Sequence, residues 1–236
     1  MFDESERAPY AAAVLVAAGR STRMGSGPPK PLLPLAGATV LAHAIAAFVE
    51  ARSVASIVVV IPEFQRADFE AATAHFGDAI TALVAGGAER THSALAGLLA
   101  VPEECSVTLV HDAARPLVKP EHIDAVAKCA RSRGAGLLAV PVNDTLHHSE
   151  DGEHAQRVID RSALWSAQTP QGFRTSELRE LLEAAIADGR VATDEAALYE
   201  AAVGPIPLVH GSPTNIKLTT PDDLRMAAAL LAPRTL

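Results

Sequence analysis

Residues 14–30, VLVAAGRSTRMGSGPPK, join a short apolar run to a loop of small residues and cations. The apolar run is typical of a strand buried on both faces, and it ends at Ala17–Gly19. Small residues let a ligand approach the main chain, and glycine permits backbone angles that point successive N–H groups one way. The loop carries the cations Arg20, Arg23 and Lys30. The stretch therefore predicts a cradle for a polyphosphate at the carboxyl end of a parallel strand.

The loop does not carry either of two common phosphate-binding patterns. The P-loop pattern G-x-x-x-x-G-K-[ST] is absent. The dinucleotide-binding pattern G-x-G-x-x-G is also absent, and no acidic residue is suitably placed about 20 residues later. The simpler alternative is a tight turn whose cations are solvated. Three cations directly after a buried strand favour the cradle over that alternative.

The composition restricts the class of protein. A hydrophobic share of 49% in 236 residues is ample for a core, whereas a net charge of −8 and 4% aromatics disfavour a nucleic-acid or anionic-membrane binder. Cys105 and Cys129 lack CxxC spacing, so neither a disulfide framework nor a zinc site is indicated. The first ten residues are acidic, and no apolar run approaches the roughly 20 residues that span a bilayer. We expect a soluble, cytoplasmic protein.

Predicted strands alternate with predicted helices along the chain, which is typical of a doubly wound, mostly parallel α/β sheet. In such sheets the ligand lies beyond the carboxyl ends of the strands, where the polar clusters of this chain gather. We expect one domain, residues 1–236, with Thr39 capping the first helix. The expected strands are 11–17, 56–61, 80–84, 107–110, 136–141, 206–209 and 216–218, and the expected helices are 39–52, 63–75, 90–100, 120–133, 176–188, 193–202 and 221–232.

Residues at about 142–160 are polar and predict a projecting β-hairpin, here called the arm. Its two strand-like pieces, around 145–148 and 156–159, flank an acidic Glu-Asp-Gly-Glu turn. Such a hairpin has little to pack on within its own subunit, so we expect a partner subunit, most simply in a homodimer. The spacing of the arm's three histidines is poor for zinc.

His111-Asp112 follows the fourth predicted strand and has three interpretations. Asp112 caps the next segment while His111 packs, or the pair belongs to a metal hydrolase, which would need further ligands such as HxxxH. The third interpretation is a carboxylate that holds a divalent ion beside phosphates, since Mg²⁺ takes only one or two carboxylates and fills its shell with water and phosphate oxygen. Arg115 adds a further cation for an anion.

Other polar stretches are less specific when each is taken alone. Thr193-Asp194-Glu195 is typical of a helix N-terminus with Thr193 as the cap, and residues 165–173 predict a rigid corner that closes the pocket wall. Arg157, Arg161 and Lys217 form a looser set of cations. Lys217 is the better candidate for binding a ligand, because it lies between a turn and a predicted short strand.

Taken together, AAGRSTRMGSGPPK, VHDAARP, PVNDT, DRSALWSAQTPQGF, TDEA and NIKLTTPDDL resemble, in this order, the 2-C-methyl-D-erythritol 4-phosphate cytidylyltransferases. The resemblance covers about residues 12–229 and implies the sugar-nucleotidyltransferase-like fold. It implies a reaction of CTP with 2-C-methyl-D-erythritol 4-phosphate that gives the CDP-alditol and pyrophosphate, in the non-mevalonate isoprenoid pathway. It also implies Mg²⁺ or another divalent cation, and a dimer in which the arm crosses to the other subunit.

The resemblance also implies roles for individual residues. Arg23 and Lys30 would stabilise the transition state, and Asp112 would lie near the metal and the acceptor alditol. The residues implied to bind the nucleotide are Ala17, Ala18, Gly19, Gly87, Ser93 and Lys217. The residues implied to surround the acceptor are Asp112, Arg115, Thr145, Arg161, Thr169, Thr193 and Lys217.

Three positions depart from the family pattern. Ala88 and Thr214 stand where an acid can occur in relatives, and Pro31 is unusual after Lys30 and would stiffen the loop. Two alternatives of function stay open at this point: a cytidylyltransferase for another alditol phosphate, such as ribitol 5-phosphate, and a non-catalytic nucleotide-binding regulator.

Overall fold

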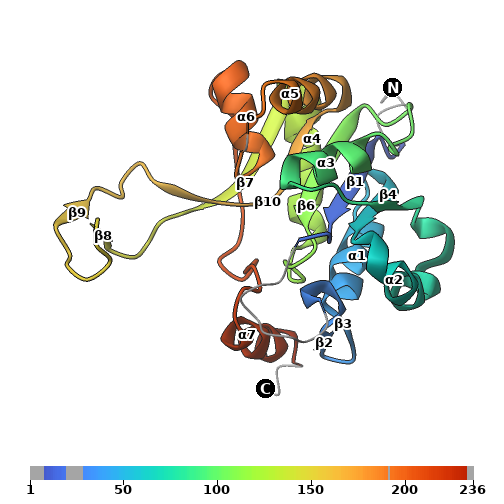
Figure 1. Ribbon diagram of the computed structural model, residues 1–236, viewed down its shortest axis with the longest axis horizontal. Coiled ribbons are helices and arrows are strands. Elements are labelled where there is room, and N and C mark those ends of the chain that lie inside the picture. Colours follow the sequence, from blue (N-terminus) through green and yellow to red (C-terminus); the bar gives the residue numbers. More distant parts are fainter. Residues whose placement is uncertain (1–7, 20–28, 191, 233–236) are drawn as a thin grey trace, which may run out of the picture.

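The computed structural model describes residues 8–19, 29–190 and 192–232 (Figure 1). Within this part, the main sheet has seven strands in the order β11-β7-β10-β6-β1-β4-β5. The strands are β1 (Ala11–Val16), β4 (Val54–Ile61), β5 (Ala82–Ala85), β6 (Val107–Asp112), β7 (Ala135–Pro141), β10 (Trp165–Arg174) and β11 (Leu208–His210). The α-helices are α1 (Val40–Glu50), α2 (Arg66–Thr73), α3 (Arg90–Leu98), α4 (Pro120–Arg133), α5 (Thr175–Ala187), α6 (Glu195–Ala202) and α7 (Pro221–Leu231).

The sheet is mostly parallel, which confirms the predicted fold class. β1 pairs in parallel with β4 on one side and with β6 on the other, and the pairs β4–β5 and β7–β11 are also parallel. β10 runs antiparallel between β6 and β7. The register places Val16 opposite Asp112, so β1 and β6 end side by side.

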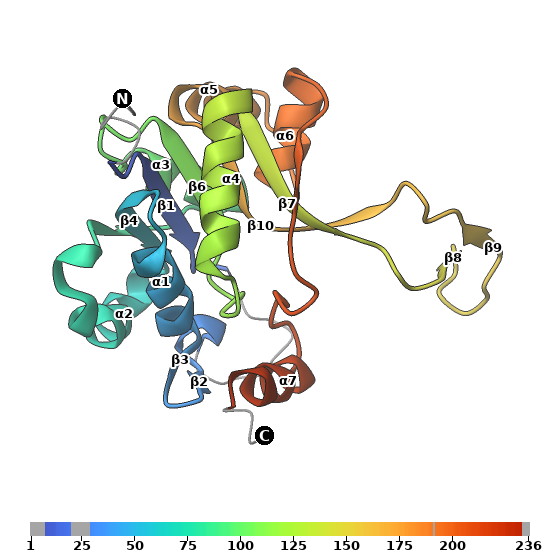
Figure 2. The ribbon, with the colours of Figure 1, turned by 180° about the vertical axis from the view of Figure 1, so that it is seen from behind.

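Helices cover both faces of the sheet and bury its apolar strands. α1 and α4 pack on one face, where Phe48 and Ile123 are fully buried, and α4 crosses β6, β7 and β10 (Figure 2). α3, α5 and α6 pack on the other face, around Phe173 and Leu178. The strands can be apolar throughout because neither face of the central sheet meets water. The two layers hold the carboxyl ends of β1 and β6 in fixed positions.

The 3₁₀ helices η4 (Glu63–Gln65) and η5 (Ala74–Ala79) flank α2, and further small elements lie outside the main sheet. The 3₁₀ helix η3 (Lys30–Leu32) leads into the two-stranded ribbon β2 (Pro34–Leu35) and β3 (Ala38–Thr39), and α7 packs beside this ribbon. The arm leaves the body after β7 and returns into β10, with β8 (Leu146–His148) antiparallel to β9 (Arg157–Ile159). It extends far from the sheet in both views (Figures 1 and 2). The predicted hairpin is thus confirmed.

Three local expectations are wrong. Residues 165–173 are not a corner but lie in β10, because six consecutive buried residues from Gln168 to Phe173 fit between β6 and β7. Residues 216–218 form no strand, since they follow the loop after β6 instead of a sheet edge. Thr193 does not cap α6; the cap is Asp194, whose carboxylate accepts from the N–H of Ala197 at 3.0 Å.

In the described parts of the chain, no helix is long and apolar enough to cross a bilayer.

Candidate active site

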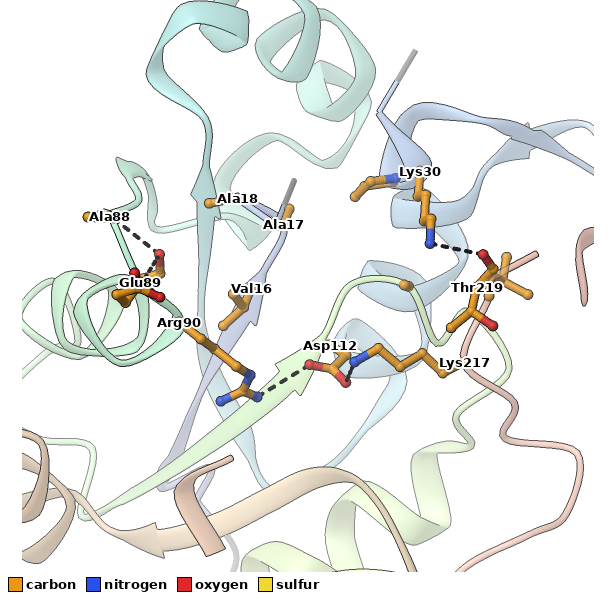
Figure 3. A pocket seen from close by; sticks show the side chains of 16 residues that line it. Val16, Ala17, Ala18, Lys30, Ala88, Glu89, Arg90, Asp112, Lys217 and Thr219 are labelled. Carbon is orange, nitrogen blue, oxygen red and sulfur yellow. Dashed lines mark hydrogen bonds and ion pairs between the residues drawn. The ribbon is translucent and has the colours of Figure 1, made fainter. Parts of the chain in front are cut away.

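A pocket of about 450 Å³ lies beyond the carboxyl ends of β1 and β6 (Figure 3). One wall comes from the end of β1 and the start of α3, and the opposite wall comes from η3 and the segment before α7. Its described lining residues are Val16, Ala17, Ala18, Gly19, Lys30, Pro31, Gly87, Ala88, Glu89, Arg90, Ser93, Asp112, Ala114, Lys217, Leu218 and Thr219. The structure therefore brings together the predicted cradle and two distant stretches, around residues 111 and 217.

The cradle wall is built from close backbone contacts. The N–H of Gly86 donates to the carbonyl of Ile61 at 2.8 Å, which sets the loop after β5 beside the end of β4. A Cβ on Gly86 would lie 2.4 Å from the Cβ of Ala18, and one on Gly87 would lie 2.3 Å from the Cβ of His92. Since real Cβ atoms do not approach so closely, both positions require glycine. The small residues of this wall are thus needed for its packing.

Ser93 holds the loop that forms this wall. Its Oγ accepts from the N–H of Gly87 at 3.1 Å and donates to the carbonyl of Glu89 at 3.1 Å. A hydroxyl has one proton and two lone pairs, so one lone pair is left for a ligand. Ser93 lines the pocket as predicted, and it also fixes the position of residues 87–89.

Asp112 is the centre of charge in the pocket. Its Oδ1 accepts from Nη2 of Arg90 at 3.3 Å, and its Oδ2 pairs with Nζ of Lys217 at 2.8 Å (Figure 3). Nε of Arg115 lies 3.8 Å from Oδ2. Burial raises the pKa of Asp112, but the positive charges of Arg90, Lys217 and Arg115 outweigh burial and hold this pKa well below its usual range. The carboxylate is therefore ionised at neutral pH.

Arg90 joins this cluster to α6. Its Nη1 pairs with the carboxylate of Glu195, whose side chain is 2% exposed. Burial lowers the pKa of Arg90, but the charges of Glu195 and Asp112 more than compensate and raise this pKa above its usual value. The guanidinium is accordingly a permanent cation between two carboxylates.

His111 and Thr169 lie behind Asp112 and support it. The Oγ1 of Thr169 accepts from the N–H of Asp112 at 3.0 Å and lies 3.0 Å from Nδ1 of His111. Burial lowers the pKa of His111 to about 4, so the ring is neutral at pH 7. Its Nε2 lies 3.2 Å from the carbonyl of Arg115, which can only accept, so Nε2 carries the proton and Nδ1 accepts from Thr169. His111 thus packs and does not act as a ligand.

The segment that carries Lys217 is tied to β10 and to the loop after β6. The fully buried Asn215 donates through Nδ2 to the carbonyl of Thr169 at 3.0 Å. Arg115 donates through Nη1 to the carbonyl of Asn215 at 2.7 Å, and the N–H of Leu218 donates to the carbonyl of Ala114 at 2.8 Å. These contacts aim Lys217 at Asp112, although the segment is not a strand.

Lys30 and Pro31 form the opposite wall. Nζ of Lys30 donates to the carbonyl of Thr219 at 3.2 Å, and the buried Pro31 lies in the 3₁₀ turn η3, which fixes the base of the Lys30 side chain. The other predicted catalytic residue, Arg23, lies outside the described residues, as does Arg20.

Several predicted acceptor residues do not line this pocket within one chain. Thr145 and Arg161 are exposed and lie at the two ends of the arm, and Thr193 is exposed beside the cap of α6. Arg115 and Thr169 lie directly behind the pocket wall, through their contacts with Asn215 and Asp112.

Sequence reasoning missed Arg90, Glu195 and Asn215. A signal for Arg90 was present, because a cation in the first turn of a helix opposes the helix dipole and needs a carboxylate nearby. From the sequence, Glu195 is only an acid that offsets the dipole at the start of a helix. Asn215 belongs to the NIKLTTPDDL stretch, but nothing in the sequence indicates that its side chain is fully buried.

The pocket can hold a metal ion only with the help of a ligand. Among the described residues, no group of three or more His, Cys, Asp or Glu side chains could bind one. Asp112 offers one carboxylate, which suits an ion such as Mg²⁺ whose remaining ligands are water and phosphate oxygens. The donor set fits that ion and does not fit a protein-caged zinc or calcium.

Comparison with known proteins identifies the family of the chain. The family model described as 2-C-methyl-D-erythritol 4-phosphate cytidylyltransferase matches residues 11–233. A protein of that name from Bacillus velezensis is 44% identical over 92% of this chain and 94% of its own length, and one from Geobacillus kaustophilus is 40% identical over 94% and 97%.

Solved structures agree as well. The crystal structure of 2-C-methyl-D-erythritol 4-phosphate cytidylyltransferase from Thermus thermophilus has a TM-score of 0.75 at 36% identity, covering 92% of this chain and 97% of that one. The enzyme from Francisella tularensis has a TM-score of 0.78 at 28% identity, covering 94% and 99%. The chain thus belongs to the family of 2-C-methyl-D-erythritol 4-phosphate cytidylyltransferases.

Proposed function

We propose that the pocket at the ends of β1 and β6 is where this nucleotidyltransferase joins CTP to 2-C-methyl-D-erythritol 4-phosphate. Membership of the family shows the reaction, cytidylyl transfer in the non-mevalonate pathway, and disfavours ribitol 5-phosphate as the acceptor and a non-catalytic regulator. The single observation that carries the placement is the Asp112 carboxylate, set among Arg90, Lys217 and Arg115 beside a glycine cradle.

The two walls suggest where each substrate binds. The wall of Ala17, Ala18, Gly87 and Ser93 is narrow and rich in backbone groups, which suits a nucleobase and its phosphates. The opposite wall carries the side chain of Lys217 and lies in front of Arg115, which suits the phosphate of the acceptor. Asp112 lies between the two walls and can accept from a hydroxyl of the alditol.

The reaction is an in-line displacement at the α-phosphorus of CTP. A phosphate oxygen of the acceptor forms the new P–O bond, and the bond to the leaving pyrophosphate breaks. The nucleophile is already an anion at neutral pH because the second pKa of a phosphate monoester is about 6. No general base is therefore required of this chain, and the neutral, buried His111 is not one.

The task of the protein is to bring two polyanions together and to stabilise charge on the reacting phosphate. Fixed cations in a pocket with little water serve this purpose. We assign it to Lys30 and Lys217, whose ammonium groups both come from the wall opposite the cradle, and to Arg23, which belongs to the cradle loop in the sequence. Loss of one such group costs on the order of 10²–10³ in rate, by analogy with a lost oxyanion donor.

Asp112 would hold the divalent cation together with phosphate oxygens of CTP. When bound, an ion such as Mg²⁺ supplies positive charge to the triphosphate and so favours departure of pyrophosphate. For Asp112 to act as a metal ligand, Lys217 must move away from Oδ2. Lys217 has room to move because its side chain is 47% exposed.

The arm supports a homodimer. It projects from the body (Figures 1 and 2). Leu146 and Val158 of the arm are exposed, with 36% and 62% of their surfaces accessible. We place Thr145 and Arg161 at the acceptor site of the partner subunit, since within their own chain they lie away from the pocket. We also place the enzyme in the cytoplasm, because its substrates are highly charged and do not cross membranes.

One assay tests the proposed function. The protein is incubated with Mg²⁺, each of CTP, UTP, ATP and GTP, and either 2-C-methyl-D-erythritol 4-phosphate or ribitol 5-phosphate, and pyrophosphate release is followed. Turnover with CTP and the methylerythritol phosphate is expected. Equal turnover with UTP, or a preference for ribitol 5-phosphate, would contradict the proposal.

A further inference from the structure

The guanidinium of Arg90 bridges two carboxylates from distant parts of the chain. It pairs with Glu195 through Nη1 and with Oδ1 of Asp112 through Nη2 at 3.3 Å. Glu195 is 1% exposed and is not among the described residues that line the pocket. Any effect of Glu195 on the reaction therefore has to pass through Arg90.

The two oxygens of Asp112 have partners of different kinds. Oδ2 pairs with Lys217, a flexible side chain that is 47% exposed, and exposed lysine pairs exchange readily. Oδ1 pairs with Arg90, whose other end is held by a buried carboxylate. Breaking that second contact would leave a buried charge without its partner, which is costly. Oδ1 is thus anchored, and Oδ2 is exchangeable.

The anchor is itself held in place. Gln171 of β10 accepts from the N–H of Ala196 at 2.9 Å and donates to Oδ2 of Asp194 at 2.8 Å, so the start of α6 is fixed to the sheet. The Oε2 atom of Glu195 is buried and has no hydrogen-bond partner within the described structure. Its carboxylate is therefore committed to Arg90.

From these contacts we propose that Arg90 and Glu195 are positioning residues. Arg90, held by Glu195, keeps Oδ1 of Asp112 toward α3 and so presents Oδ2 to the substrates. This inference rests on the proposed role of Asp112, and it adds a requirement for a buried carboxylate on α6 that never touches either substrate.

The test is a double-mutant cycle in the full-length enzyme. Glu195→Gln keeps the shape of the side chain but removes its charge, and Asp112→Asn removes the group on which it acts. The matched control is Glu177→Gln, since Glu177 also pairs with an arginine, Arg174 at 2.9 Å, but its side chain on α5 is only partly buried, with 35% of its surface accessible. Wild-type turnover with CTP and 2-C-methyl-D-erythritol 4-phosphate is measured first and tests the proposed function by itself.

We expect Glu195→Gln to lower kcat about tenfold or more, the size of effect typical of outer partners of ligand carboxylates. The KM for CTP should stay within about twofold, and the control should match the wild type. In the Asp112→Asn background, Glu195→Gln should have no further effect. Equal losses in both backgrounds would overturn the proposal, because Glu195 would then act independently of Asp112.

Two measurements separate positioning from mere stability. The double variant Arg90→Met with Glu195→Met replaces the buried pair with apolar side chains, a change that proteins often tolerate. This variant should unfold near the wild-type temperature and still show the low kcat. A wild-type kcat in this variant would contradict the proposal, because the Arg90–Glu195 pair would then contribute only packing. A crystal structure of Glu195→Gln should show the Asp112 carboxylate in more than one orientation, and a single unchanged orientation would overturn the inference even without kinetic data.

Discussion

Replacing Thr169 with valine should destabilise the protein through two buried partners. The Thr169 hydroxyl accepts from the N–H of Asp112 and donates to Nδ1 of His111, both at 3.0 Å, and Thr169 is 4% exposed. Valine has nearly the same shape, so no cavity forms. It leaves both partners buried without a hydrogen bond, and each such group costs roughly 1–3 kcal/mol. Two groups would cost roughly 2–6 kcal/mol, and because both relax partly we expect the free energy of unfolding to fall by about 3 kcal/mol, in the lower half of that range.

The measurement is urea unfolding of wild type, Thr169→Val and Thr169→Ser at pH 7. Serine keeps the hydroxyl and loses one methyl group, so the Ser variant should lose about 1 kcal/mol. A Val variant within about 1 kcal/mol of the wild type would refute the reasoning, as would a Ser variant as unstable as the Val variant. Direct contact between Thr169 and the acceptor stays a prediction from the family resemblance, and a change in KM for the acceptor in the Ser variant would bear on it.

Three further predictions concern the pocket and the last helix. Lys217→Met should lower kcat on the order of 10²-fold with a smaller effect on CTP affinity, and equal losses in both would remove it from the transition-state role. Gly86→Ala should weaken CTP binding in calorimetry, because its Cβ would lie 2.4 Å from that of Ala18; unchanged affinity would contradict the close contact. Burial raises the pKa of Asp223, but the hydrogen bonds that its carboxylate accepts from Thr219 and Thr220 together outweigh burial and hold this pKa below its usual range. The start of α7 should therefore be protected against amide exchange at every pH above the pKa of Asp223 in the unfolded chain, which is about 4. This protection should fall as the pH drops through the lower pKa of Asp223 in the folded protein. The variant Asp223→Asn should lack this pH dependence.

The parallel part of the fold was predictable because its local signals agree with one another. An apolar run such as 56–61, a helix capped by Thr39 and a proline at the start of α4 each indicate one structure, and the protein has all three. β10 escaped prediction because Pro170 and Gly172 are typical turn residues. Gly172 is needed there for a different reason: its Cβ would lie 2.8 Å from Val126 of α4, so only glycine lets the helix approach the strand.

The site was predictable as a set of chemical groups, but its internal connections were not. The cradle and Asp112 lie together because strand ends meet at one edge of a parallel sheet, which is a rule of topology. Arg90 and Glu195 pair although they lie 105 positions apart in the sequence. Nothing in the sequence around either residue distinguishes it from a charged residue exposed to solvent. Thr169 was assigned to the acceptor from the family resemblance, whereas its hydroxyl is occupied by Asp112 and His111.

The course of β10 links the arm, at which the proposed homodimer would form, to the proposed site. The strand starts at Trp165, where the arm re-enters the body, and Thr169 follows only four residues later, roughly 13 Å along an extended chain. The end of the arm and Thr169 thus lie on the same strand, although the pairing of β10 with β7 shifts register between Ala167 and Gln171. An inhibitor that binds at the base of the arm would displace this strand and so lower turnover without competing with either substrate.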